Sequence, residues 1–262
     1  MDKRILTPKE IAHAICETGT AKAQLRFSQI LVLGIFAGAF IALGAQGALT
    51  IGQTLGQIDV GLQKFAMAAI FPIGLMLVVV CGGELFTGNN LMTLGCINLK
   101  YSWQRIARNW TLVYFSNLIG ALLIVLLVIG SGIAVKDTPF AELAVKIATK
   151  KVHLSFMQAL FSGILCNLLV SLAVWMAAGA RDVVSKLFAC WFPVLLFVLS
   201  GYEHCVANMF YLPIGLLLGA PITWGQIALN NLLPVTIGNI IGGAVIVPWF
   251  YHVAYMREPK KQ

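Results

Sequence analysis

The stretch Gly201-Tyr202-Glu203-His204-Cys205-Val206-Ala207-Asn208-Met209-Phe210 decides how this chain folds. It carries an acid, an imidazole and an amide inside a long apolar region, where inserting one ionisable group costs roughly 2.5–3.5 kcal/mol. A second stretch, Gly82-Gly83-Glu84-Leu85-Phe86-Thr87-Gly88-Asn89, repeats the spacing G-x-E-x-x-x-x-N. Ionisable groups at membrane depth usually face a pathway or a partner rather than lipid. We therefore expect the two stretches to form a transmembrane pore.

The composition is that of an integral membrane protein. Hydrophobic residues make up 59% of the chain and charged residues 11%, whereas soluble domains carry about 25% charged residues. The length suits about six helical spans, which we expect near residues 28–49, 65–82, 109–130, 155–178, 187–201 and 227–252. The net charge is +8, and the basic residues lie in loops that flank apolar runs, as membrane topology demands. We therefore exclude a nucleic-acid partner. The six cysteines form no CxxC pair, and we expect no disulfide, metal or cofactor.

The second and fifth spans are expected to be broken. Each contains Phe-Pro (Phe71-Pro72 and Phe192-Pro193), runs into one of the polar stretches and resumes as a shorter apolar piece, near 89–98 and 207–219. Irregular backbone at this depth is tolerated only where it is buried in protein or lines a cavity. This pattern favours two broken helices that meet inside the protein.

The two halves of the chain also match each other outside the polar stretches. Phe36-Ala37-Gly38 is similar to Phe161-Ser162-Gly163, and Asn117-Leu118-Ile119-Gly120 to Asn239-Ile240-Ile241-Gly242, in the same order and at similar spacing. A repeat of three spans must invert between the halves. The prediction is an all-α integral membrane protein with six transmembrane helices in an inverted 3+3 repeat.

The whole chain, 1–262, is expected to be a single channel domain in the plasma membrane. Lysine and arginine concentrate on one side, which places both termini in the cytoplasm by the positive-inside rule. Its parts would be an N-terminal amphipathic helix (1–26), the first repeat (27–130), an extracytoplasmic loop (131–154), the second repeat (155–252) and a cytoplasmic tail (253–262). Thr7-Pro8-Lys9-Glu10 is typical of a capping box, and the helix that follows should turn Ile11, Ala12, Ile15 and Cys16 toward the membrane. Such a helix lies on the bilayer surface or packs on a neighbouring subunit.

His204 is the histidine that we predict at mid-membrane. Imidazole titrates at about pH 6.5 when unperturbed, so it can hold or release a proton. A lone buried histidine is more often structural, but its place in a broken helix beside Glu203 favours a role in the pore. Thr87 would approach His204 if the two breaks meet, and Asn167 is a further polar candidate for that centre.

The other conspicuous side chains divide into three groups. For Glu84 and Glu203 we favour a structural role, as acceptors for backbone N–H groups freed at the breaks, over ion binding. Asn89 and Asn208 would tie down the broken ends. Together, apolar residues flanking the centre would form constrictions that oppose hydrated ions: Phe71, Leu75, Leu85, Phe86, Val170 and Phe197. Four lysines crowd the predicted outer loop, either as an ordinary solvated loop or as a rim that concentrates anions: Lys136, Lys146, Lys150 and Lys151.

At these residues the chain resembles the formate/nitrite transporter family. The two polar stretches look like that family's two loop signatures, and Gly163-Ile164-Leu165-Cys166-Asn167 also fits. The resemblance covers essentially the whole chain. Among the branches, the chain is most similar to the hydrosulfide- and formate-conducting bacterial members.

The resemblance implies a homopentamer of aquaporin-like protomers, each with its own pore for small monovalent anions such as formate, nitrite or hydrosulfide. It also implies roles for matching residues: His204 as central histidine with Thr87 and Asn167 as hydrogen-bond partners, Phe71 and Phe197 as outer slit, Leu85 and Val170 as inner slit, and Lys151 and Lys22 as vestibule lysines. Such a protein is a channel and not an enzyme.

Alternatives stay open for both the mechanism and the function. The anion either crosses as its neutral acid, with a proton delivered through His204 or water, or crosses intact beside oriented N–H dipoles. An aquaporin-like channel for neutral solutes is the rival function, although the Asn-Pro-Ala signature is absent because Asn89 precedes Asn90 and Asn208 precedes Met209. A membrane enzyme or metal site using His204, Cys205 and Cys166 ranks lower, because no ligand spacing fits.

Overall fold

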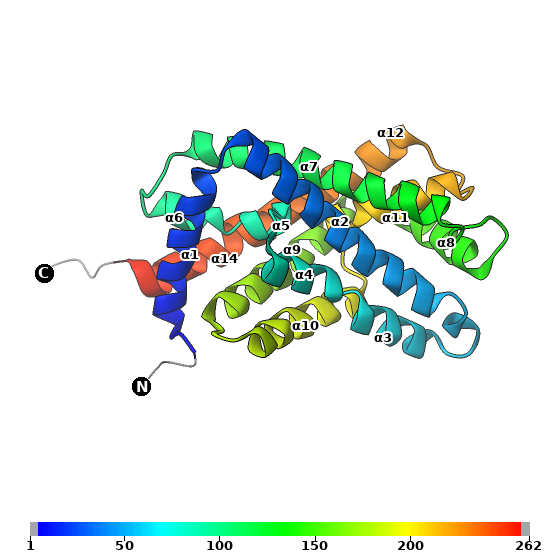
Figure 1. The fold of residues 1–262 in the computed structure, drawn as a ribbon, viewed down its shortest axis with the longest axis horizontal. Helices are drawn as coiled ribbons and strands as arrows, with labels where there is room; N and C mark the ends of the chain where they lie inside the picture. The colour runs from blue at the N-terminus through cyan, green and yellow to red at the C-terminus, as the bar shows by residue number, and fades with distance from the viewer. Residues whose placement is uncertain (1–4, 258–262) are drawn as a thin grey trace, which may run out of the picture.

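The computed structural model describes residues 5–257, and that part of the chain is almost entirely helical (Figure 1). It contains six helices long and apolar enough to cross a membrane. These are Phe27–Gly52, Val60–Gly82, Trp103–Gly130, Phe156–Gly179, Val183–Ser200 and Trp224–Met256. The six predicted spans are confirmed. Several observed helices are longer than the predicted spans, because polar residues next to the apolar runs are also helical. The predicted terminal segments include residues 1–4 and 258–262, which lie outside the described residues.

The first half of the chain contains one peripheral helix and three spans. Its elements are α1 (Pro8–Ala23), α2 (Phe27–Gly52), the short 3₁₀ helix η1 (Leu55–Gln57), α3 (Val60–Ile70), α4 (Ile73–Leu77), the π-helix η2 (Val78–Gly82), α5 (Phe86–Asn89), α6 (Met92–Ile97) and α7 (Trp103–Gly130).

The second half repeats this plan. Its elements are α8 (Pro139–Val152), α9 (Phe156–Gly179), α10 (Val183–Ser200), α11 (Cys205–Leu217) and one long last span. That span consists of α12 (Trp224–Gln226), the π-helix η3 (Ile227–Leu232), α13 (Leu233–Ile240), the π-helix η4 (Ile241–Ile246), α14 (Val247–Tyr251) and the π-helix η5 (His252–Met256).

Both predicted breaks are present, and a glycine begins each of them. Gly82 has φ +88° at the end of η2, and the chain then runs extended until α5 starts at Phe86. Gly201 has φ +75° at the end of α10, and the chain runs extended until α11 starts at Cys205. A left-handed φ is readily available to glycine, so each break sits where the sequence changes from an apolar run to a polar motif.

The matched glycines of the two halves let helices cross closely. A Cβ atom on Gly38 of α2 would lie 2.0 Å from the carbonyl oxygen of Asn117 in α7. A Cβ atom on Gly163 of α9 would lie 2.7 Å from the carbonyl oxygen of Val235 in α13. Small residues at such crossings let backbones approach. The inverted 3+3 repeat thus has equivalent helix contacts in its two halves.

Two peripheral segments differ from expectation. The segment 131–154, expected as a loop, contains α8, whose apolar face packs against α11. The capping box of Thr7 and Glu10 is present at the start of α1. However, α1 does not turn its apolar residues toward the membrane. Ile11 and Ile15 are buried beside Leu94 and Trp175 of the same chain, because α6 and α9 provide an apolar surface for them (Figure 1).

Candidate functional site

His204 lies where the two breaks meet. It precedes α11 as its N-cap residue, and its Nδ1 accepts the backbone N–H of Ala207 at 3.0 Å. Its Nε2 lies 2.8 Å from Oγ1 of Thr87, which belongs to α5 on the other break. Both side chains are buried. Because Nδ1 is already an acceptor, the neutral ring carries its proton on Nε2. This N–H donates a hydrogen bond to Oγ1 of Thr87.

Two asparagines hold the backbone of the breaks. In the first break, the Oδ1 of Asn117 accepts the N–H of Phe86 at 2.9 Å, and its Nδ2 donates to the carbonyl of Glu84 at 2.9 Å. In the second break, the Oδ1 of Asn239 accepts the N–H of Cys205 at 2.9 Å, and its Nδ2 donates to the carbonyl of Glu203 at 3.0 Å. Backbone groups freed at membrane depth are therefore satisfied by side-chain amides.

This arrangement corrects the expected partners of the two glutamates. Their carboxylates have side-chain partners instead of the freed backbone N–H groups, which the asparagines already occupy. Glu84 accepts from Nζ of Lys22 at 2.5 Å and from Nδ2 of Asn89 at 2.6 Å. Asn89 also donates to Oδ1 of Asn109 at 2.9 Å. A buried carboxylate needs a counter-ion, and the lysine at the end of α1 supplies it.

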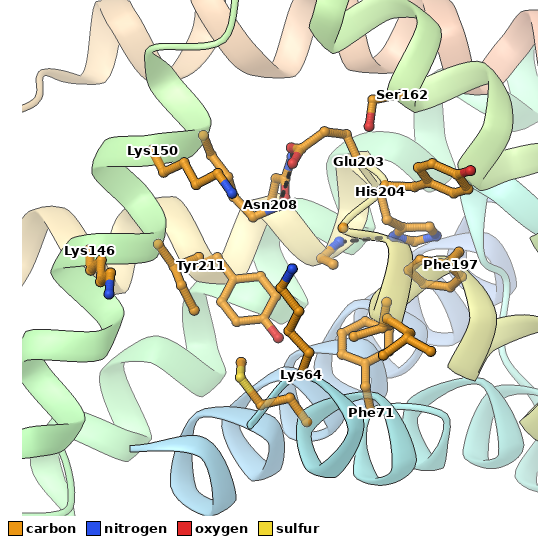
Figure 2. A pocket seen from close by; sticks show the side chains of 18 of the residues that line it. Lys64, Phe71, Lys146, Lys150, Ser162, Phe197, Glu203, His204, Asn208 and Tyr211 are labelled. Carbon is orange, nitrogen blue, oxygen red and sulfur yellow. Dashed lines mark hydrogen bonds and ion pairs between the residues drawn. The ribbon is translucent and has the colours of Figure 1, made fainter. Parts of the chain in front are cut away.

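Glu203 has the equivalent partners on the opposite break. It accepts from Nζ of Lys151 at 2.8 Å, from Nδ2 of Asn208 at 2.7 Å and from Nδ2 of Asn231 at 3.2 Å (Figure 2 marks the pair with Asn208). Asn208 also donates to Oδ1 of Asn231 at 2.7 Å. Asn109 and Asn231 were not among the predicted site residues. Their spacing, equal to that of Asn117 and Asn239, is the signal that would have found them.

Asn167 lies beside the centre and has no hydrogen bond to His204. Its Nδ2 donates to Oδ1 of Asn90 at 2.7 Å, to the carbonyl of Asn239 at 2.7 Å and to the carbonyl of Thr87 at 3.3 Å. It therefore links the backbone of α5 to α13, and its relation to His204 runs through Thr87.

A cavity of about 430 Å³ opens on one side of His204 (Figure 2). Phe71 and Phe197 line it beside His204, and their rings meet edge to face with centroids 5.6 Å apart. Phe197 also stacks on the imidazole with centroids 5.8 Å apart. The two phenyl rings therefore form an apolar part of the cavity wall directly beside His204.

The other predicted constriction residues do not line this cavity. Leu75, Leu85, Phe86 and Val170 are all buried. The ring of Phe86 packs edge to face against Tyr114 of α7 at 5.0 Å, so it contacts α7 instead of the Phe71–Phe197 pair.

Lysines surround the cavity. Lys64 of α3 and Lys146, Lys150 and Lys151 of α8 line it, whereas Lys136 does not. Among residues 5–257, Lys151 is paired with Glu203, and the other three have no carboxylate within ion-pair distance. A cavity with unpaired ammonium groups attracts anions. In the same part of the chain no cluster of three or more His, Cys, Asp or Glu residues is arranged to hold a metal.

Comparison with known proteins agrees with this geometry. The family model for the formate/nitrite transporter matches residues 9–253. The uncharacterized transporter YrhG of Bacillus subtilis is 40% identical over 257 residues, covering 97% of this chain and 96% of its own length. The formate channel FocA of Escherichia coli is 37% identical over 273 aligned residues, covering 97% of this chain and 96% of its own.

Solved structures of similar fold are channels. A pentameric formate channel with formate bound superposes with a TM-score of 0.81 at 34% identity, covering 88% of this chain and 98% of that one. An FNT family ion channel superposes with a TM-score of 0.87 at 30% identity, covering 94% and 98%. The chain therefore belongs to the formate/nitrite transporter family and is a membrane transport protein, not an enzyme.

Proposed function

We propose that this protein conducts small monovalent weak-acid anions across the plasma membrane, with formate as the first candidate and nitrite and hydrosulfide as the others. The observation that carries the proposal is the hydrogen bond between Thr87 and His204, which joins the two breaks directly beside the Phe71–Phe197 pair. The formate channels among the relatives support formate as the first substrate to test.

The proposed path begins in the lysine-lined cavity. Unpaired ammonium groups raise the local concentration of the anion, and the buried phenyl rings of Phe71 and Phe197 oppose a bare charge. A weak-acid anion that takes a proton from a hydronium ion in the cavity, leaving water behind, crosses the rings as a neutral acid. Beside them, the hydroxyl of Thr87 accepts the N–H at Nε2 of His204 and has its own O–H to donate to the substrate.

The geometry supports His204 as a hydrogen-bond donor in this path. A proton on Nδ1 would face the N–H of Ala207, which now donates to that atom. Delivery of the proton by cavity water leaves this bond intact. Leu85 and Val170 are proposed as the inner constriction, and Lys22 as the lysine of the inner side.

The assembly and orientation belong to the same proposal. We expect a homopentamer, because a similar solved structure is a pentameric formate channel. We expect both termini in the cytoplasm, because most lysines and arginines outside the spans lie on that side. The lysine-lined cavity then opens to the extracytoplasmic side.

Flux into proteoliposomes tests the proposal. Formate, nitrite and hydrosulfide are compared at two pH values with wild type, His204→Phe and the control His13→Phe, which changes an exposed histidine of α1. We expect uptake of at least one anion that rises at low pH, is lost in His204→Phe and persists in His13→Phe. Passage of glycerol without any anion would favour the neutral-solute channel and overturn the proposal.

A further inference from the structure

Tyr211 begins a row of aromatic rings that runs along the cavity wall and ends at His204. Its ring stacks on Phe71 with centroids 6.5 Å apart and planes at 14°. Phe71 meets Phe197 edge to face, and Phe197 stacks on His204. Nζ of Lys151 lies 5.6 Å from the centroid of the Tyr211 ring, within range of a cation–π interaction. Tyr211 therefore contacts both the aromatic pair and the ammonium group bound to Glu203.

The hydroxyl of Tyr211 has no hydrogen-bond partner among residues 5–257. Tyr211 is buried, with 7% relative exposure, and it lines the cavity. A tyrosine hydroxyl in such a place usually finds a partner. Figure 2 shows Tyr211 on the cavity wall with Lys64, Lys146 and Lys150, whose positive charge favours an anion there.

We propose that Tyr211 is a specificity-determining residue, whose hydroxyl donates a hydrogen bond to an oxyanion held by the unpaired lysines just outside the Phe71–Phe197 pair. This inference rests on the proposed function and names its substrate class, which is a small anion with oxygen acceptors, a carboxylate or nitrite. The charged oxygen of such an anion accepts a strong hydrogen bond from a hydroxyl. Sulfur is a weak acceptor, so hydrosulfide gains little from the same hydroxyl.

The position of the hydroxyl explains why it affects selection. An anion that reaches the Phe71–Phe197 pair must lose water, and a donor at that point replaces part of its hydration. The lysines attract every anion alike because charge alone does not distinguish oxygen from sulfur. The hydroxyl of Tyr211 does, because an oxygen of the anion accepts its hydrogen bond more strongly than sulfur does.

The test compares Tyr211→Phe with wild type in proteoliposomes, using formate, nitrite and hydrosulfide as substrates. Phenylalanine keeps the ring contacts with Phe71 and Lys151 and removes only the hydroxyl. We expect the half-saturation concentrations for formate and nitrite to rise about tenfold, the factor for one charge-assisted hydrogen bond in a partly hydrated site. That for hydrosulfide should change less than twofold. Tyr255→Phe is the matched control, because Tyr255 lies in η5 and does not line the cavity.

Two further variants keep the result interpretable. Tyr211→Leu removes the ring and should slow all three anions, which separates packing from hydrogen bonding. Incorporation of 3-fluorotyrosine at position 211 makes a stronger donor and should lower the half-saturation for formate. An unchanged half-saturation for formate in Tyr211→Phe, or an equal rise for all three anions, would overturn the inference while wild-type flux still upholds the proposed function. Absence of any anion flux in wild type would overturn both.

Discussion

The backbone N–H of Ala207 donates to Nδ1 of His204 at 3.0 Å, and this contact fixes which nitrogen of the ring carries the proton. We predict the neutral Nε2–H tautomer at neutral pH. Nitrogen-15 NMR of histidine-labelled protein checks it, with an unprotonated Nδ1 signal and a protonated Nε2 signal expected for His204. A protonated Nδ1 would contradict the assignment, and His204→Phe identifies the signal by its loss.

Thr87 is expected to matter through its hydroxyl. Thr87→Val keeps the shape of the side chain but leaves the N–H at Nε2 of His204 without its acceptor, at a cost of about 1–3 kcal/mol. We predict a loss of formate flux of at least about tenfold. Thr87→Ser keeps the hydroxyl and should retain most of the flux. Equal flux in the valine and serine variants would show that the hydrogen bond is not used.

The ion pair between Lys151 and Glu203 is expected to stabilise the second break. Lys151→Met leaves the buried Glu203 carboxylate without its counter-ion and should lower the free energy of unfolding by about 3–5 kcal/mol. The double variant Lys151→Met/Glu203→Gln should recover much of that loss. Denaturant titration of the purified protein measures both.

Lys146→Met is the control for this experiment, because Lys146 lies on the same helix, is exposed and has no carboxylate partner among the described residues. It should change the free energy of unfolding by less than about 0.5 kcal/mol. A loss in Lys146→Met as large as that in Lys151→Met would point to the helix and not to the ion pair.

The close contact between α2 and α7 leaves no room for a side chain at Gly38. The Cβ of Gly38→Ala would lie 2.0 Å from the carbonyl oxygen of Asn117, so the helices must separate. We predict a destabilisation of about 1–3 kcal/mol or more, measured by thermal unfolding. Gly130→Ala at the end of α7, where no atom lies within 4 Å of the new Cβ, should be neutral or slightly stabilising.

Docking of α1 should protect Cys16 from alkylation. The thiol is buried, and burial raises the pKa of Cys16 to about 11. Because the pKa is raised, the reactive thiolate is scarce at pH 8, about 0.1% of the thiol, and labelling by N-ethylmaleimide should accelerate as the pH rises toward 11. Ile11→Asp, which introduces a charge into the α1 contact, should accelerate labelling at pH 8, as followed by peptide mass spectrometry. Ile5→Asp, at an exposed isoleucine, should not.

Much of the fold could be predicted because its signals are local or periodic. Apolar runs predicted the spans, and the polar motifs beginning at Gly82 and Gly201 predicted the breaks. The partners of Glu84 and Glu203 could not be predicted, because Lys22 and Lys151 approach them from distant parts of the chain. The helix α8 was missed because its charged residues, including Lys150 and Lys151, suggested a solvated loop, whereas its apolar face packs on α11.

The same reasons apply to the candidate site. His204 and Thr87 were placed together because the repeat predicted where their breaks meet, and the structure puts them 2.8 Å apart. Tyr211 was missed because a tyrosine within an apolar run carries no signal of its own. Its significance comes from the cavity that its hydroxyl faces, which forms where α3, α8, α9, α10 and α11 pack together.

Neither lysine that binds a break glutamate belongs to a membrane-spanning helix. Lys22 lies in the last turn of α1, and Lys151 lies in the last turn of α8. Each break is therefore joined by one ion pair to a helix outside the six candidate spans. A sideways shift of α1 or α8 would take the lysine away from a buried carboxylate. The break would then carry a net negative charge, which repels anions. The positions of α1 and α8 thus determine the net charge beside each break.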